Sequence, residues 1–294
     1  MIVMKRWWLA AVAILATPLL AACGGASDGA VATGDGVSVV TSFYPLQYVA
    51  ERVAGARAQV VNLTQPGREP HDLELTVRQT AAIADSDVVA YEKGFQPDID
   101  AAIEQNGPEH VVDAATVAHL EGDDPHFWLD PRRLGEVAVA FERQIADVDP
   151  SHARAYARNL ASLQRDLEHL DETYQHGLAH CRIDTVVVSH DAFGYLGRRY
   201  GFQVVGINGL SPDAEPSPAH VRQLQDLIRD DGITTLFSER LASREFAESI
   251  ANDLGIRTAV LDPIEGLSES TVNQDYLSLM RTNLSALRNA NGCS

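Results

Sequence analysis

The chain is 294 residues long and strongly acidic, with 41 Asp and Glu against 23 Lys and Arg and a formal net charge of −18. Nucleic acid and anionic lipid headgroups are therefore excluded as primary ligands, because binding phosphate requires a basic face. Hydrophobic residues make up 45% of the chain, which is enough to build the core of one large domain or of two smaller lobes.

Residues 1–22 have the features of a signal peptide. Lys5 and Arg6 precede an apolar run from Trp7 to Ala22, which is shorter than the ~20 residues that a spanning helix needs. The run ends in Leu-Ala-Ala followed by Cys23, which resembles a bacterial lipobox. We therefore expect cleavage before Cys23, lipidation of its sulfur and a location on the outer face of the cell membrane. A plain secretory signal is the alternative.

After the signal peptide, we expect residues 23–36 to form a flexible tether, because they are mostly Gly, Ala, Ser, Thr and Asp. From there, apolar runs of strand length alternate with helical patterns such as 46–53 and 77–83, which is typical of a parallel sheet with helices on both faces. The rhythm breaks at Asp130-Pro131 and resumes near Thr185. We therefore predict an α/β protein with two lobes, at 37–145 and 181–294. The predicted strands are 37–40, 60–63, 88–91, 111–112, 185–188, 203–205, 234–237 and 258–261.

One long helix is predicted to link the lobes, within residues 146–180. Asp149-Pro150-Ser151 has the features of a helix start. A helix over 151–180 would be about 45 Å long, at about 1.5 Å per residue. It could run along both lobes and join them rigidly. Its apolar stripe, at alternating steps of four and three residues, consists of Tyr156, Leu160, Leu163, Leu167, Leu170 and Tyr174.

The cysteines favour one disulfide. If Cys23 is lipidated, Cys181 and Cys293 remain, and an even number of thiols in an oxidising compartment favours a bridge. This bridge would tie the end of the chain to the start of the second lobe. Two unrelated buried thiols are the alternative.

Four strand-end loops carry side chains that can coordinate a metal, and ligands of parallel sheets gather at these ends. The side chains are those of His71, His126, His190 and Asp262. Three imidazoles and a carboxylate suit tetrahedral Zn²⁺, whereas Mn²⁺ prefers more oxygen ligands. Because histidines in loops are common, residue types and spacing alone establish only a possible metal site.

Two further acids compete for roles at this site. Glu239 follows the strand at 234–237, so it is either the fourth ligand in place of Asp262 or an acceptor that holds a ligand imidazole. Glu74, three residues after His71, is a further candidate to orient an imidazole.

The histidine segments, together with three segments of the second half, resemble the motifs of the zinc and manganese substrate-binding proteins of bacterial ABC importers. The resemblance implies two α/β lobes joined by a long rigid helix, with the metal buried between them and bound by His71, His126, His190 and Asp262. In this family the third ligand tends to be His in zinc proteins and Glu in manganese proteins, so His190 favours zinc. The similar segments are PHDLE at 70–74, DPHFWLDP at 124–131, SHDAFGY at 189–195, GLSPDAEPSP at 209–218, LFSE at 236–239 and AVLDPIEGL at 259–267.

The resemblance implies a receptor that captures Zn²⁺ outside the cell membrane and delivers it to the permease and ATPase of an importer. We expect it to act as a monomer and to perform no chemistry. A manganese receptor of the same family is the nearest alternative. A zinc hydrolase, which would keep a coordination position open for water, and an adhesin are more distant alternatives.

Overall fold

The computed structural model describes residues 36–294. The expected signal peptide, Cys23 and residues 23–35 of the expected tether lie outside the described residues. No helix in the described part of the chain combines the length and apolar character needed to cross a membrane.

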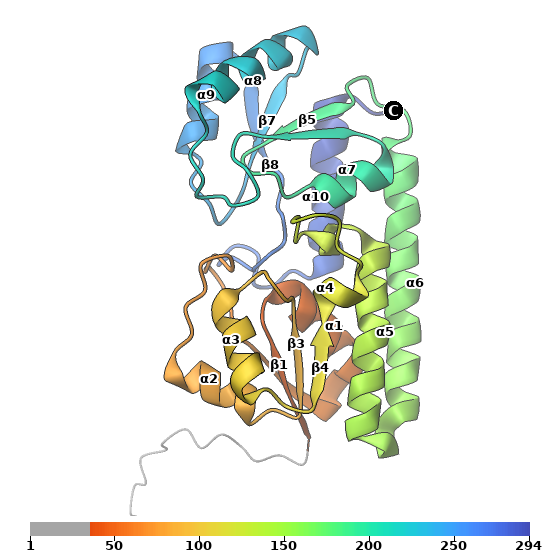
Figure 1. Cartoon of the computed structure of the whole chain (residues 1–294). Coiled ribbons are helices and arrows are strands. Elements are labelled where there is room, and N and C mark those ends of the chain that lie inside the picture. Colours follow the sequence, from red (N-terminus) through yellow and green to blue (C-terminus); the bar gives the residue numbers. More distant parts are fainter. Residues whose placement is uncertain (1–35) are drawn as a thin grey trace, which may run out of the picture. The chain divides into compact units, whose positions relative to one another are not determined.

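The first lobe is built on a four-stranded parallel sheet in the order β2-β1-β3-β4 (Figure 1). Its strands are β1 (Val37–Thr41), β2 (Ala58–Asn62), β3 (Val88–Tyr91) and β4 (His110–Asp113). Apolar side chains of both sheet faces are buried in separate clusters. The helical segments of this lobe are α1 (Tyr44–Ala54), η1 (Gly55–Arg57), α2 (Val77–Ala84), α3 (Pro97–Asn106), α4 (Ala114–Val117), η2 (Phe127–Leu129) and α5 (Pro131–Val148).

The second lobe repeats this plan, with a parallel sheet in the order β6-β5-β7-β8. Its strands are β5 (Thr185–Val188), β6 (Gln203–Gly206), β7 (Thr235–Ser238) and β8 (Arg257–Val260), and its helices are α7 (Gly194–Tyr200), α8 (Pro218–Asp230), α9 (Glu245–Leu254) and α10 (Tyr276–Asn291). The two-lobed α/β prediction is confirmed, and all eight predicted strands are present with ends shifted by a few residues. The exact lobe boundaries stay a prediction.

The long helix α6 (Ala153–Leu178) has 26 residues and follows a short 3₁₀ turn, η3 (Pro150–His152). It is therefore two residues shorter at each end than predicted. Its apolar stripe is buried except for Leu160, which is partly exposed. The helix packs against α1 and α5 of the first lobe and against α10 of the second, so it touches both lobes as expected (Figure 1).

Helix α5 was not predicted, because Asp130-Pro131 was interpreted only as a break in the strand and helix rhythm. In the structure these two residues begin the helix. The Asp130 side chain accepts a hydrogen bond from the Arg132 backbone N–H, and Pro131 occupies the first turn, where a missing N–H has no cost.

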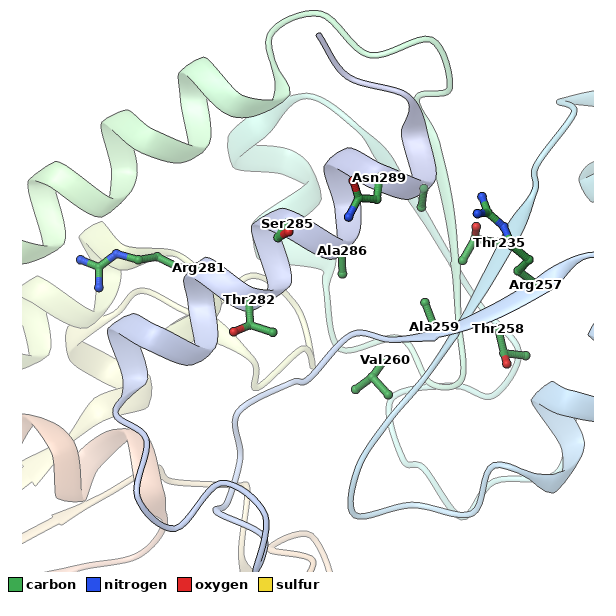
Figure 2. A pocket seen from close by; sticks show the side chains of 11 residues that line it. Thr235, Arg257, Thr258, Ala259, Val260, Arg281, Thr282, Ser285, Ala286 and Asn289 are labelled. Carbon is green, nitrogen blue, oxygen red and sulfur yellow. The ribbon is translucent and has the colours of Figure 1, made fainter.

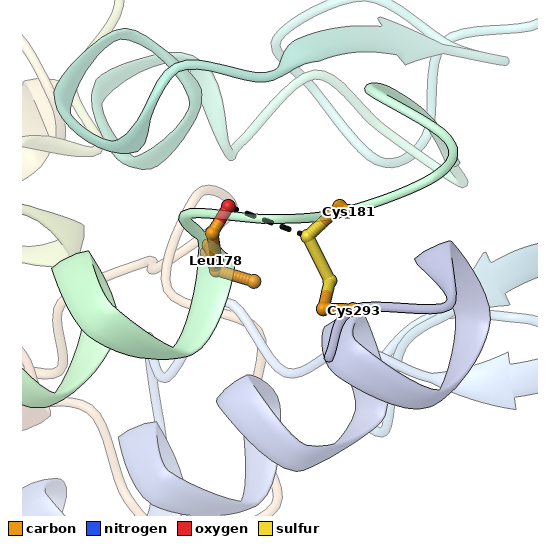
Figure 3. Close-up of a disulfide and its surroundings, with 3 residues drawn as sticks. All are labelled: Leu178, Cys181 and Cys293. Atoms are coloured by element: carbon orange, nitrogen blue, oxygen red, sulfur yellow. Dashed lines mark hydrogen bonds between the residues drawn. A yellow bond between two sulfur atoms is a disulfide. The ribbon is translucent and has the colours of Figure 1, made fainter.

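The structure pairs Cys181 with Cys293 in a disulfide, with an S–S distance of 1.96 Å (Figure 3). Cys181 lies just after α6, where its sulfur is 3.4 Å from the Leu178 carbonyl oxygen. Cys293 lies just after α10. The bridge closes a loop of 112 residues and joins the end of the linking helix to the end of the chain.

Replacing both Cys181 and Cys293 by Ser should lower the free energy of unfolding by about 2–4 kcal/mol, because the unfolded chain loses a long cross-linked loop. The midpoint of urea unfolding measures this change. The parent protein in reductant is the control and should fall to the same stability. A double variant that unfolds at the parent's midpoint would contradict the prediction.

Candidate metal centre

Three imidazoles and one carboxylate meet between the two lobes, in the segments that follow β2, α4, β5 and β8. His71 lies after β2, His126 just before η2, and His190 two residues after β5. Glu265 completes the group from the segment after β8. Each of the four side chains offers a donor atom, and these atoms all lie within 4.8 Å of one another.

The Glu265 carboxylate is the centre of this group. Its Oε1 lies 3.1 Å from His126 Nε2, 3.4 Å from His190 Nε2 and 3.5 Å from His71 Nε2. Glu265 is 1% exposed, and His126 and His190 are fully buried. The His71 side chain keeps 13% exposure. Three ring nitrogens are thus directed at one buried oxygen.

Two carboxylates fix the imidazoles from the opposite side. Asp124 Oδ1 lies 2.9 Å from His126 Nδ1, and Glu239 Oε1 lies 2.6 Å from His190 Nδ1. The Ser189 hydroxyl donates a second hydrogen bond to Glu239. A carboxylate on one ring nitrogen sets the ring orientation and leaves the other nitrogen for a metal. Glu239 thus contacts the ring nitrogen of His190 that is directed away from Glu265.

The charge of Glu265 is compensated inside the protein. Burial by itself would raise the pKa of its carboxyl, but the imidazoles of His126, His190 and His71 close to Oε1 outweigh burial and hold the pKa well below its ordinary value. Next to it, burial and the charge of Glu265 raise the pKa of Glu69 to about 9. Glu265 is therefore ionised at neutral pH, and Glu69 is protonated.

The pKa values of the two fully buried imidazoles are shifted upward. Burial lowers the pKa of His190, but hydrogen bonds to Glu239 and Glu265 and the charges of both outweigh it and raise the pKa to about 10. Burial likewise lowers the pKa of His126, and hydrogen bonds to Asp124 and Glu265 raise it overall. Without a metal, a proton on these rings balances the buried carboxylate.

Two residues expected at the site lie elsewhere. Asp262 was expected as the fourth ligand, but its carboxylate accepts hydrogen bonds from Arg240 Nε and the Ile264 backbone N–H, each at 2.9 Å, and Asp262 is not part of the group of four. Glu74 was expected to orient an imidazole, but in the described structure it is exposed and no hydrogen bond joins it to a histidine.

Sequence reasoning missed Glu265 and the role of Asp124. Both lie within segments already singled out, Glu265 three residues after Asp262 and Asp124 two residues before His126. The short spacing of Asp124 and His126 was a usable signal, because a side chain at that distance in a turn can reach its neighbour's ring. Nothing local distinguishes Glu265 from Asp262.

Three imidazole nitrogens and one carboxylate oxygen form the donor set of a tetrahedral Zn²⁺ site. The four donors are already gathered, and three of the four side chains are buried. The Glu265 carboxylate takes the position that a hydrolytic zinc site keeps for water.

A separate groove of about 600 Å³ lies between β8 and α10 (Figure 2). Its lining includes two arginines, Arg257 and Arg281, and several hydroxyl side chains, but no histidine, cysteine or acid. This groove therefore offers no ligand set for a metal cation.

Known proteins are similar to this chain over most of its length. Residues 39–290 match the family described as zinc-uptake complex component A, periplasmic. The chain belongs to this family. One family relative, the high-affinity zinc uptake system protein ZnuA of Bacillus subtilis, is 30% identical, with 97% of this chain and 98% of that protein covered.

Two further matches come from Streptococcus pneumoniae, one to a whole protein and one to a solved domain. The zinc-binding lipoprotein AdcA is 31% identical over 86% of this chain, which spans 55% of the relative's length. The chain thus spans about half the length of the AdcA relatives. The Zn(II)-bound ZnuA-like domain of AdcA matches with a TM-score of 0.77 at 30% identity, covering 87% of this chain and 99% of that domain.

Another buried carboxyl, that of Glu92, lies at the end of β3. The side chain is 1% exposed, and neither of its oxygens has a hydrogen-bond partner among the described residues. Burial, reinforced by the charges of Asp124 and Asp113, raises its pKa well above the ordinary 4.5. Glu92 is therefore protonated in the folded protein over a pH range where the unfolded chain is ionised.

Because the folded-state pKa is raised, stability should fall as the pH rises above about 4.5, by up to about 1.4 kcal/mol per pH unit from this group. Glu92→Gln removes this loss, so the variant should be more stable than the parent at pH 8, with an advantage that shrinks toward pH 4.5. Urea unfolding at several pH values measures it. Glu104→Gln, at an exposed position of α3, is the control and should give a pH-independent difference. An equally constant difference for Glu92→Gln would contradict the prediction.

Proposed function

We propose that this protein is an extracytoplasmic zinc receptor, which binds Zn²⁺ through His71, His126, His190 and Glu265 and delivers it to an ABC-type importer. The observation that carries the proposal is the convergence of three Nε2 atoms on one buried carboxylate oxygen. The family match supports the transport role, and so do the names of the zinc-binding relatives.

The donor set favours zinc over the manganese alternative. Manganese binds best where oxygen donors dominate, whereas three imidazoles suit zinc. Catalysis is not part of the proposal, because Glu265 occupies the position that a hydrolytic zinc site needs for water. The protein would bind and release the ion without changing it.

Location and partners follow from the chain's first residues and from its family. We propose that Cys23 carries the lipid anchor, which would keep a monomeric receptor at the outer face of the cell membrane. The partners would be the importer's permease and ATPase. A groove of about 650 Å³ is lined by four acids, Glu121, Asp123, Asp124 and Asp191, and by one arginine, Arg198, which pairs with Glu121 and Asp124. Its lining is negative overall and includes the partner of His126, which supports a cationic cargo.

The purified protein should bind one zinc ion per chain, and His126→Ala should weaken binding by orders of magnitude, because it removes a donor from a buried site. Competitive titration with zinc and manganese, with metal content as a second readout, measures both. His176→Ala removes an exposed imidazole of α6 and should leave affinity unchanged. Equal zinc affinity of the parent and His126→Ala would show that this ring is not a ligand. Tight binding of manganese together with weak binding of zinc would favour the manganese alternative.

Zinc affinity should also rise with pH, by roughly tenfold per pH unit for each proton displaced, because the metal must replace a proton on the imidazoles. Since hydrogen bonding raises the pKa of His190 to about 10, the rise should continue above neutral pH. Competitive titrations from pH 6 to 9 measure it. Glu239→Gln removes the negative charge beside His190 Nδ1, so its curve should level off at lower pH. A parent affinity that is constant between pH 7 and 9 would show that no proton is displaced there.

A further inference from the structure

Asp262 is buried close to the metal centre without belonging to it. Its Oδ1 accepts a hydrogen bond from the Ile264 backbone N–H, and its Oδ2 accepts one from Arg240 Nε, both at 2.9 Å. Its backbone is fixed as well, since its N–H donates to Asn283 Oδ1 at 2.9 Å and its carbonyl accepts from Asn283 Nδ2 at 2.6 Å. Asp262 is thus tied to the second lobe by both its side chain and its backbone.

The residue that Asp262 holds has an unusual backbone conformation. Ile264 has φ of 59° and is fully buried. A β-branched residue in this left-handed region is a genuine outlier, and such a conformation persists only where the surroundings enforce it. The hydrogen bond from the Ile264 N–H to Asp262 is one such constraint. Glu265 is the next residue, so its direction depends on this turn.

Beyond Asp262 the chain is held by the first lobe. Trp128 Nε1 donates to the Pro263 carbonyl at 2.7 Å, and the Tyr44 N–H donates to the Glu265 carbonyl at 3.3 Å. The turn at Ile264 therefore lies between an anchor on the second lobe and anchors on the first. Glu265 is presented to the imidazoles from this doubly anchored turn.

We propose that Asp262 is a positioning residue, whose carboxylate stabilises the left-handed turn at Ile264 and thereby directs Glu265 at the three histidines. The inference rests on the proposed function of the site. Each oxygen of Asp262 already accepts a hydrogen bond, and Asp262 is not one of the four gathered donors.

The loop after β7 contacts both Asp262 and a second donor residue, His190. Glu239 accepts from His190 Nδ1, and the next residue, Arg240, donates to Asp262. Adjacent residues of one loop therefore orient His190 directly and Glu265 through Asp262. A change at Arg240 should consequently affect the metal centre, although Arg240 is not one of the four donors.

A double-mutant cycle tests the inference. Asp262→Ala should weaken zinc binding by about 10–100-fold, the usual effect of losing a residue that orients a metal ligand. In a Glu265→Ala background the same change should alter affinity by no more than about twofold, because Asp262 acts through Glu265. An equal loss in both backgrounds would show that Asp262 contributes independently, as a ligand would, and would overturn the inference. An unchanged single variant would also overturn it.

Asp171→Ala is a matched control for loss of a buried, arginine-paired carboxylate. Asp171 is 3% exposed and receives two hydrogen bonds of 2.6 Å from Arg199. This variant should lose stability but keep its zinc affinity and the visible absorption spectrum of its Co²⁺-loaded form. Asp262→Ala should change that spectrum, because the carboxylate donor moves, and an unchanged spectrum would contradict the inference.

If Asp262→Ala fails to fold, Arg240→Gln provides the same test, since it removes the partner of Asp262 Oδ2 from a partly exposed position. It should weaken zinc binding in the parent but not in the Glu265→Ala background, and an equal effect in both would overturn the inference. A parent protein without tight zinc binding would overturn the proposed function and this inference together. Tight binding by the parent with an additive cycle would overturn only the role of Asp262.

Discussion

The burial of one carboxylate charge, that of Glu265, is the constraint on which the site depends. Transferring an ionised carboxylate from water into a protein interior is very unfavourable unless positive charge and hydrogen bonds compensate it. Here three imidazoles from different loops provide that compensation, and at His126 and His190 a further carboxylate supports the ring from behind. A bound cation is therefore needed to stabilise the buried carboxylate of Glu265. Without metal it is a proton on the rings, and a divalent ion that replaces the proton meets donors already in place.

The frame around the site limits how far these donors can separate. Helix α6 contacts helices of both lobes, and the disulfide joins its end to the end of α10. Trp128 connects the lobes close to the site, because its ring nitrogen donates to the Pro263 carbonyl and its own carbonyl accepts from the Tyr276 hydroxyl at 2.6 Å. Separating the lobes would leave these buried polar groups without partners, which is costly. Ion exchange through small movements of loops should therefore cost less free energy than wide opening of the lobes.

The sequence was sufficient for most of the fold because its signals are local. The strands are short apolar runs, and the stripe of α6 follows the helical period. The three histidines were identified because they lie in strand-end loops and within family-like segments. Helix α5 was missed because Asp130-Pro131 both interrupts one pattern and begins another. The choice between Asp262 and Glu265 depends on a left-handed backbone at Ile264 and on contacts from Arg240 and Asn283, which are distant in sequence. No local pattern contains that information.

The four donors are not equally constrained, and this difference bears on release of an ion. The rings of His126 and His190 are fully buried and each is held by a carboxylate at Nδ1. The Glu265 side chain is fully enclosed, and its backbone is bonded to the first lobe. His71 keeps partial exposure, and its Nε2 has no hydrogen-bond partner among the described residues. Turning His71 away therefore breaks fewer interactions than moving any other donor. Since His71 is also the most exposed of the four side chains, the physical cost of opening the site is lowest at His71.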